Sequence, residues 1–133
     1  MKVVYVAGRY KAPTEWEIFR NIMAARSVAM DVWRMGAVAL CPHLNNMLFG
    51  GYVYPFEPNR DRNVWLEGDM ELLRRCDAVV TVYGWESSEG ASDEVKLAAK
   101  LTIPVFHDTE RLREWLNAAT GTLGRSGANV EAP

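Results

Sequence analysis

Residues 78–82 read AVVTV, and this short run constrains the fold more than any other part of the chain. Apolar or β-branched side chains occupy every position, so neither face of the segment is suited to water. Such a pattern is typical of a strand in a parallel sheet that helices cover on both faces. We therefore expect a buried central strand in an α/β domain.

Similar short strands alternate with helical patterns along the chain. The expected strands are residues 3–7, 37–41, 77–82 and 103–106, and the expected helices are about 14–35, 61–76, 90–101 and 109–119. Alternation of this kind predicts a parallel sheet with right-handed crossovers. We expect a Rossmann-like or flavodoxin-like sheet of four or five strands, with helices on both faces, over residues 1–120.

Two segments lack a clear period. Residues 42–60 contain Gly50, Gly51 and three prolines, which predicts a long loop of the kind that is often functional or mobile. Residues 121–133 (GTLGRSGANVEAP) are rich in glycine and alanine, and we expect them to form a flexible C-terminal tail.

Composition narrows the class of partner and compartment. The 133 residues suit one domain, and a net charge of -2 argues against a broad contact with a nucleic-acid polymer. Cys41 and Cys76 have no CxxC spacing, so we expect reduced core thiols and a cytoplasmic protein. No apolar run is long enough to span a bilayer, and no membrane partner is expected.

Several common motifs are missing. The chain has no GxxxxGK[ST], GxGxxG or GxSxG sequence, which argues against the usual phosphate-binding loops and the nucleophile elbow. His43 and His107 are too isolated for a metal site, so we expect neither a metal nor a cofactor. His43 follows the second strand, and it either faces a ligand or is a polar loop residue.

Ligands of parallel sheets bind beyond the carboxyl ends of the strands. In this chain those ends are Gly8-Arg9-Tyr10, Pro42-His43 and the residues from Gly84 onward. The third end continues as YGWESSEGASDEV, residues 83–95, in which four acids precede or begin a helix.

Asp69 interrupts the apolar stripe of the helix at 61–76. Trp65, Leu72 and Cys76 lie at i, i+7 and i+11, and Asp69 takes the i+4 position, where an apolar residue is usual. A carboxylate on a core-facing line needs a partner or a polar pocket. Asp69 is either a site residue or a structural acid that pairs with an arginine or caps a loop.

Glu94 is the second acid that the helical pattern turns inward. It shares a face with Ala91, Ala98 and Leu101, whereas Glu89 and Asp93 are explained by the helix dipole, which favours acids in the first turn. Two neighbouring carboxyl groups push their pKa values apart, so that one is a nucleophile while the other carries a proton. Glycoside chemistry uses such a pair.

Together these residues resemble a known family. VYVAG at 4–8, the helix–strand pattern D…CDAVV and S-x-G-x-x-x-E at 88–94 resemble the nucleoside 2-deoxyribosyltransferase superfamily, which includes deoxynucleoside 5′-monophosphate N-glycosidases. The resemblance spans residues 3–106 and is closest to an uncharacterised, partly phage-borne branch. It implies a Rossmann-like fold and a homo-oligomer in which a second subunit often completes the site.

The resemblance also implies roles for three catalytic residues. Glu94 matches the nucleophile that attacks C1′ of the deoxyribose. Asp69 matches the acid that contacts the sugar and base and assists protonation of the leaving group. Tyr5 matches the tyrosine that orients the nucleophile, although a strand tyrosine is equally typical of a core residue.

Ligand-binding residues follow from the same resemblance. Ser88 and Gly90 match the small-residue loop that holds the 5′-phosphate in the monophosphate hydrolases. Arg9 either adds a positive charge there or is an ordinary solvated arginine. Gly8 and Tyr10 complete the first strand end. The glycine-rich loop of the glycosidase branch is replaced here by Arg9-Tyr10-Lys11.

The sequence therefore predicts cleavage or transfer of the N-glycosidic bond of a deoxynucleoside or its 5′-monophosphate. Water as acceptor would make the protein a hydrolase, and a second base would make it a transferase. A non-catalytic nucleotide-binding or sensing module is the alternative, and cleavage of another nucleotide N-glycosidic bond, such as that of NAD, is a third hypothesis.

Overall fold

The computed structural model describes residues 1–50 and 64–120. Predictions for residues 51–63 and 121–133, including the expected C-terminal tail, lie outside the described residues. Among the described residues, no helix has both the length and the apolar character needed to cross a membrane.

The centre of the domain is a four-stranded parallel sheet. Its strands are β1 (Val3–Ala7), β2 (Val38–Leu40), β3 (Ala78–Thr81) and β4 (Val105–Phe106). The order is β2-β1-β3-β4, and each neighbouring pair is parallel. The predicted flavodoxin-like sheet is confirmed. Its strand order reverses at β1, so the carboxyl ends of β1 and β3 form the edge where ligands bind in open α/β sheets.

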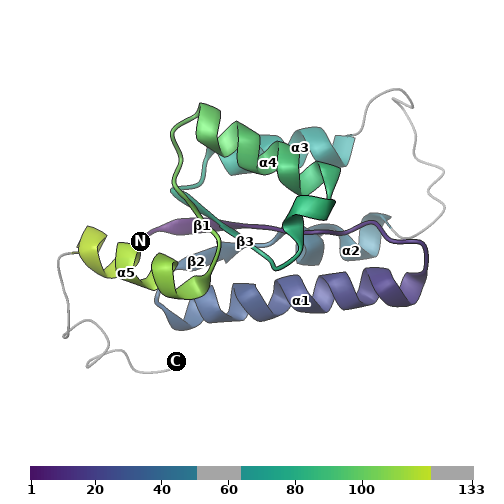
Figure 1. The fold of residues 1–133 in the computed structure, drawn as a ribbon, viewed down its shortest axis with the longest axis horizontal. Helices are drawn as coiled ribbons and strands as arrows, with labels where there is room; N and C mark the ends of the chain where they lie inside the picture. Colours follow the sequence, from purple (N-terminus) through teal and green to yellow (C-terminus); the bar gives the residue numbers. More distant parts are fainter. Residues whose placement is uncertain (51–63, 121–133) are drawn as a thin grey trace.

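Helices cover both faces of this sheet (Figure 1). α1 (Glu15–Arg34) and α5 (Thr109–Thr120) lie on one face, and α3 (Val64–Arg74) and α4 (Glu89–Lys100) lie on the other. Two separate apolar cores result, because successive side chains of β1 point to opposite faces. The core under α1 and α5 includes Val4, Val6, Ala25, Ala29, Val32, Val80, Leu112 and Leu116. The core under α3 and α4 consists of Tyr5, Ala7, Leu73, Cys76, Val79 and Ala98.

The ends of α1 have clear local causes. Thr14 caps the N-terminus: its side chain accepts from the Glu17 N–H, and the Glu17 carboxylate accepts from the Thr14 N–H. At the other end Gly36 has a φ of +83°, which a residue with a side chain rarely adopts. The predicted stop at Gly36 is confirmed.

The loop predicted over residues 42–60 is wrong in its first part, because Pro42–Gly50 forms helix α2. Proline is favourable in the first turn of a helix, where its missing N–H costs nothing. The helix packs against α1. This helix was not predicted from the sequence, because the helix has few residues, carries no charge and precedes a cluster of glycines and prolines.

Candidate active site

The ends of β1 and β3 approach each other closely at the carboxyl edge. A Cβ atom on Gly8 would lie 2.8 Å from Cβ of Val82, so only glycine fits there. Gly84 has a φ of +85° and turns the chain into a short 3₁₀ helix, η1 (Trp85–Ser87). The segment that follows β3 therefore returns over the strand ends and begins α4.

Glu94 lies on the inner face of α4. The helix starts at Ser88, whose side chain accepts a hydrogen bond from the Ala91 N–H at 3.2 Å. From that start Ala91, Glu94 and Ala98 fall on one buried face, and Glu94 is only 8% exposed. Its inward orientation was predicted from the helical period, and the burial confirms that orientation. Leu101, predicted on the same face, is 39% exposed because it lies at the C-terminal cap, beyond the last residue of α4.

Tyr5 lies in the middle of β1, on the sheet face that α4 covers. Its ring is completely buried, and its hydroxyl has no partner at full hydrogen-bond geometry among the described residues. Burial, reinforced by the charge of Glu94 and hydrogen bonding to it, raises the pKa of Tyr5 far above its ordinary value. The phenol therefore stays protonated, and its hydroxyl interacts with the Glu94 carboxyl without reaching full hydrogen-bond geometry.

The environment of Glu94 favours its protonated form. Burial raises the pKa of Glu94 from its ordinary value of 4.5 to about 7; Tyr5 opposes this as a donor, and the charges of Asp69 and Asp93 add to it. A carboxyl group with this pKa changes its charge near neutral pH. Glu94 has the properties of a group that either attacks or exchanges a proton.

Asp69 belongs to the same electrostatic group. Its charge raises the pKa of both Glu94 and Tyr5, and α3 packs directly against α4. Asp69 and Glu94 therefore lie on the same face of the sheet. The side chain of Asp69 is half-buried.

The stripe from which Asp69 was predicted is partly wrong, because Trp65 is 43% exposed and not part of the core. The helix reaches the core through its C-terminal end. There Leu73 is buried and Leu72 is partly buried, and Cys76, just beyond the end of the helix, is buried as well. Asp69 is consequently at the border of the core, where a carboxylate can face a polar space.

His43 is a buried residue of α2, although a polar loop residue was one of the two predictions for it. It is 5% exposed, and its Nε2 lies 2.7 Å from the carbonyl oxygen of Arg9. Because a carbonyl oxygen only accepts, Nε2 carries the proton. Burial lowers the pKa of His43, so in its neutral form Nδ1 is an acceptor. That nitrogen has no hydrogen-bond partner within the described ranges.

The segment after β1 is anchored at both sides. The Tyr10 ring meets the His43 ring edge-on at 5.7 Å, and the Asn21 side chain donates to the Tyr10 carbonyl at 3.1 Å. The exposed side chain of Arg9 lies against Gly84: a Cβ atom added to Gly84 would be 3.1 Å from Nη2 of Arg9. The arginine thus brings a positive charge to the start of η1.

The first turn of α4 offers backbone donors. The N–H groups of Glu89 and Gly90 have no intrahelical acceptor, because helix geometry supplies none at these positions. A Cβ atom on Gly90 would meet only Ser88 Oγ within 4 Å, at 3.9 Å, so packing among the described residues does not require glycine. Together with Arg9, this turn suits an anion.

Sequence reasoning missed one group at the same edge. Trp85 stacks on His107, with ring centroids 5.1 Å apart and an interplanar angle of 7°. His107 Nδ1 also lies 3.0 Å from the hydroxyl of Thr81, which is buried at the end of β3. The available signal was the position of His107 directly after the fourth predicted strand.

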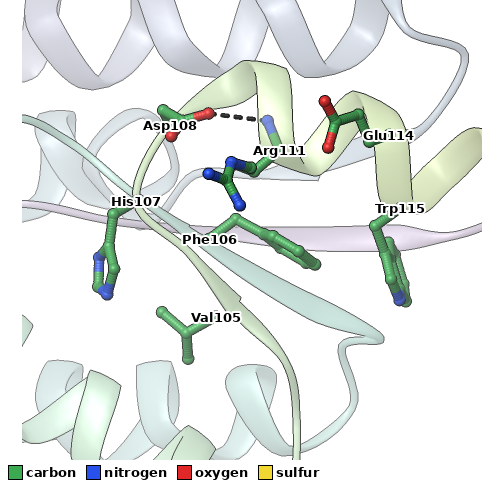
Figure 2. A pocket seen from close by; sticks show the side chains of 7 residues that line it. All are labelled: Val105, Phe106, His107, Asp108, Arg111, Glu114 and Trp115. Atoms are coloured by element: carbon green, nitrogen blue, oxygen red, sulfur yellow. Dashed lines mark hydrogen bonds between the residues drawn. The ribbon is translucent and has the colours of Figure 1, made fainter.

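A hollow of about 660 Å³ lies beside β4 and α5 (Figure 2). Its lining residues are Val105, Phe106, His107, Asp108, Arg111, Glu114 and Trp115. Neither Glu94 nor Asp69 belongs to this lining, so the hollow is not where the paired acids lie. Within residues 1–50 and 64–120, no three His, Cys, Asp or Glu side chains are grouped as metal ligands would be.

Comparison with known proteins places the chain in a family. Residues 2–108 match the family described as Domain of unknown function (DUF7768), and the chain belongs to it. No curated protein sequence is significantly similar to the chain. Among solved structures, it is similar to a 2-deoxyribosyltransferase from the psychrotolerant bacterium Bacillus psychrosaccharolyticus. The two chains are 18% identical with a TM-score of 0.52, and the match covers 77% of this chain and 69% of that one. The fold implied by the sequence resemblance is thereby confirmed.

Proposed function

We propose that this member of the DUF7768 family cleaves or transfers the N-glycosidic bond of a deoxynucleoside or a deoxynucleoside 5′-monophosphate. One observation carries the proposal. A buried glutamate, Glu94, is coupled electrostatically to the hydroxyl of Tyr5 and to the charge of Asp69 on the face of the sheet that α3 and α4 cover. The fold shared with a 2-deoxyribosyltransferase supports it.

In the proposed reaction, ionised Glu94 attacks C1′ of the deoxyribose. The bond between C1′ and the base nitrogen breaks, its electron pair leaves with the base, and the base takes up a proton from solvent with the assistance of Asp69. Water or a second base then attacks C1′, gives up a proton to solvent and releases the Glu94 carboxylate. A buried carboxylate suits this role because an environment without water leaves it weakly solvated and close to its target.

Tyr5 would orient the nucleophile. Its hydroxyl donates toward Glu94, which lowers the pKa of that carboxyl group against the opposing effect of burial. A fixed strand residue is a suitable support, since the ring has no freedom to move in the core. We propose that Tyr5 keeps enough of Glu94 ionised at neutral pH for attack.

The anionic end of a nucleotide would bind at the first turn of α4. The free N–H groups of this turn, the hydroxyl of Ser88 and the guanidinium of Arg9 supply donors and positive charge. Gly90 leaves room for close approach of a phosphate to the backbone. This subsite favours a 5′-monophosphate over a nucleoside.

The base would lie toward the segment after β1. Gly8 allows close approach to the strand end, and Tyr10 offers an aromatic ring. His43 would support this subsite from below, because its buried ring meets the Tyr10 ring edge-on.

A non-catalytic nucleotide-binding module is the second candidate. Asp93 next to the proposed nucleophile raises the pKa of Glu94 and so reduces its ionised fraction. The chain also carries Arg9 and Tyr10 where the glycosidase branch has a glycine-rich loop. Both features keep a binding role open.

A substrate panel separates these functions. Purified protein is incubated with deoxynucleosides, ribonucleosides and their 5′-monophosphates, with and without an acceptor base, and released or exchanged base is measured by chromatography. Glu94→Gln should abolish turnover, whereas Glu89→Gln, an exposed acid in the first turn of the same helix, should retain it. Turnover that survives in Glu94→Gln would contradict the proposed nucleophile. Stabilisation by nucleotides without any turnover would establish the binding module.

We also propose a homo-oligomer. Trp16, Phe19 and Met23 form an exposed row at i, i+3 and i+7 on α1, with Trp16 and Phe19 stacked at 5.8 Å. An exposed apolar row of this kind favours association. Light scattering after size exclusion should give a multiple of the 15.0 kDa chain, and Phe19→Lys should lower that mass. A monomeric wild-type protein would contradict this proposal.

A further inference from the structure

The imidazole of His107 joins the sheet to the segment that carries the proposed anion subsite. Its Nδ1 lies 3.0 Å from the buried hydroxyl of Thr81, and its ring stacks nearly parallel on Trp85 at 5.1 Å. Thr81 ends β3, whereas Trp85 begins η1. One side chain from the end of β4 thus contacts both the rigid sheet and the loop above it.

A short series of hydrogen bonds continues from Trp85 to the start of α4. The Trp85 N–H donates to the Val82 carbonyl at 3.1 Å, and the Ser88 N–H donates to the Trp85 carbonyl at 3.0 Å. Ser88 in turn caps α4 through its bond from Ala91. A shift of Trp85 would therefore move Ser88 and with it the first turn of the helix.

Among the described residues, the hydrogen bond and the ring stack of His107 are with Thr81 and Trp85 and not with the other residues that line the hollow. Figure 2 shows its ring turned away from Asp108 and Arg111, toward the side of Val105. The residue is also exposed, so its stacking does not fill the apolar core. A function in the position of η1 explains the contacts that it does make.

We propose that His107 is a positioning residue, which holds Trp85 and η1 against the end of β3 and so places Ser88 and the first turn of α4 for an anionic ligand. The ligand part rests on the proposed function, since a nucleotide phosphate is the expected anion. The mechanical part, from His107 through Trp85 to α4, stands on its own.

Amide hydrogen exchange tests the mechanical part in the absence of ligand. His107→Ala should accelerate exchange over residues 86–92 by about 2- to 10-fold, the range expected for loss of an aromatic pair. Amides in the middle of α1, such as those of Ala25 and Ala29, should keep their rates. Unchanged exchange over residues 86–92, or equal acceleration throughout the chain, would overturn the proposal.

Two conservative variants separate the contacts of His107. His107→Phe keeps a ring for Trp85 and loses the bond to Thr81, whereas His107→Asn keeps a polar group near Thr81 and loses the stack. At least one of them should restore slow exchange over residues 86–92, and Trp85→Ala should reproduce the effect of His107→Ala. If both conservative variants behave like His107→Ala while Trp85→Ala behaves like the wild type, the proposed route through Trp85 is wrong.

Binding measurements test the ligand part. Calorimetric titration of His107→Ala with a deoxynucleoside 5′-monophosphate should show a Kd raised by about 2- to 10-fold, with little change for the matching nucleoside. An equal loss for both ligands would overturn the assignment to the anion subsite. If the wild-type protein binds neither ligand, the proposed function fails, while the exchange experiment still decides whether His107 positions η1.

Discussion

Replacing Glu94 by glutamine should stabilise the protein, and the gain should depend on pH. The Glu94 carboxyl is buried, and its pKa is raised from 4.5 to about 7. A native state that raises the pKa of an acid favours the protonated form. Wild-type stability is therefore fully present below pH 4.5 and is lost as the pH rises through about 7.

The size of this effect follows from the pKa change. At 1.36 kcal/mol for each pH unit, raising the pKa of Glu94 from 4.5 to about 7 costs about 3 kcal/mol above neutral pH. Glutamine has nearly the same shape and no charge, so Glu94→Gln avoids this cost. At pH 8 the free energy of unfolding of the variant should exceed that of the wild type by about 3 kcal/mol, which corresponds to roughly 10 °C in Tm. At pH 4 the two proteins should differ little.

Urea denaturation at pH 4, 5, 6, 7 and 8, at equal protein concentration, measures this difference. The informative quantity is its change with pH, because any fixed effect of the amide on packing cancels. Glu89→Gln is the matched control. Glu89 is an exposed acid that interacts with the helix dipole, so its loss should destabilise the protein by at most about 1 kcal/mol at pH 8. A Glu94→Gln difference that stays constant with pH, or that falls as pH rises, would refute the reasoning.

Three further substitutions probe the same site. Asp69→Asn removes a negative charge and should lower the pKa of Glu94, which an NMR titration of the glutamate side-chain carbons would detect; an unchanged midpoint would show that the two acids are not coupled. Tyr5→Phe removes a donor and should raise the pKa of Glu94 while turnover falls; a lowered pKa would contradict the assigned contact. Ser88→Ala should cost about 1 kcal/mol of stability in urea denaturation and raise KM for a 5′-monophosphate more than for a nucleoside; equal KM changes would place the phosphate elsewhere.

The fold was predictable because each strand and most helices carry their own pattern. The buried run at residues 78–82 and the stop at Gly36 required no knowledge of distant residues. Helix α2 (Pro42–Gly50) was not predictable, since it is short, lacks charges and packs against α1. Packing of this kind is decided by tertiary contacts, which local propensity does not record.

The candidate site was predictable where the helical period determines which way a side chain points. Glu94 faces inward because it shares a helical face with Ala91 and Ala98, and the structure agrees. The partners of His107 were not predictable, because its stack on Trp85 and its contact with Thr81 join three separate segments. The partial exposure of α3 at Trp65 likewise depends on where the helix meets the sheet.

The register of β1 decides on which face of the sheet the Tyr5 hydroxyl lies. Tyr5 and Ala7 contribute to the core under α3 and α4, whereas Val4 and Val6 contribute to the core under α1 and α5. Tyr5 pairs with Val79 in β3, and a slip of one residue would exchange the two faces. The phenol would then lie on the far side of the sheet from Glu94. Inserting or deleting one residue within β1 would therefore separate the two groups even if the strand still formed, whereas a two-residue shift would at least return the tyrosine position to the correct face.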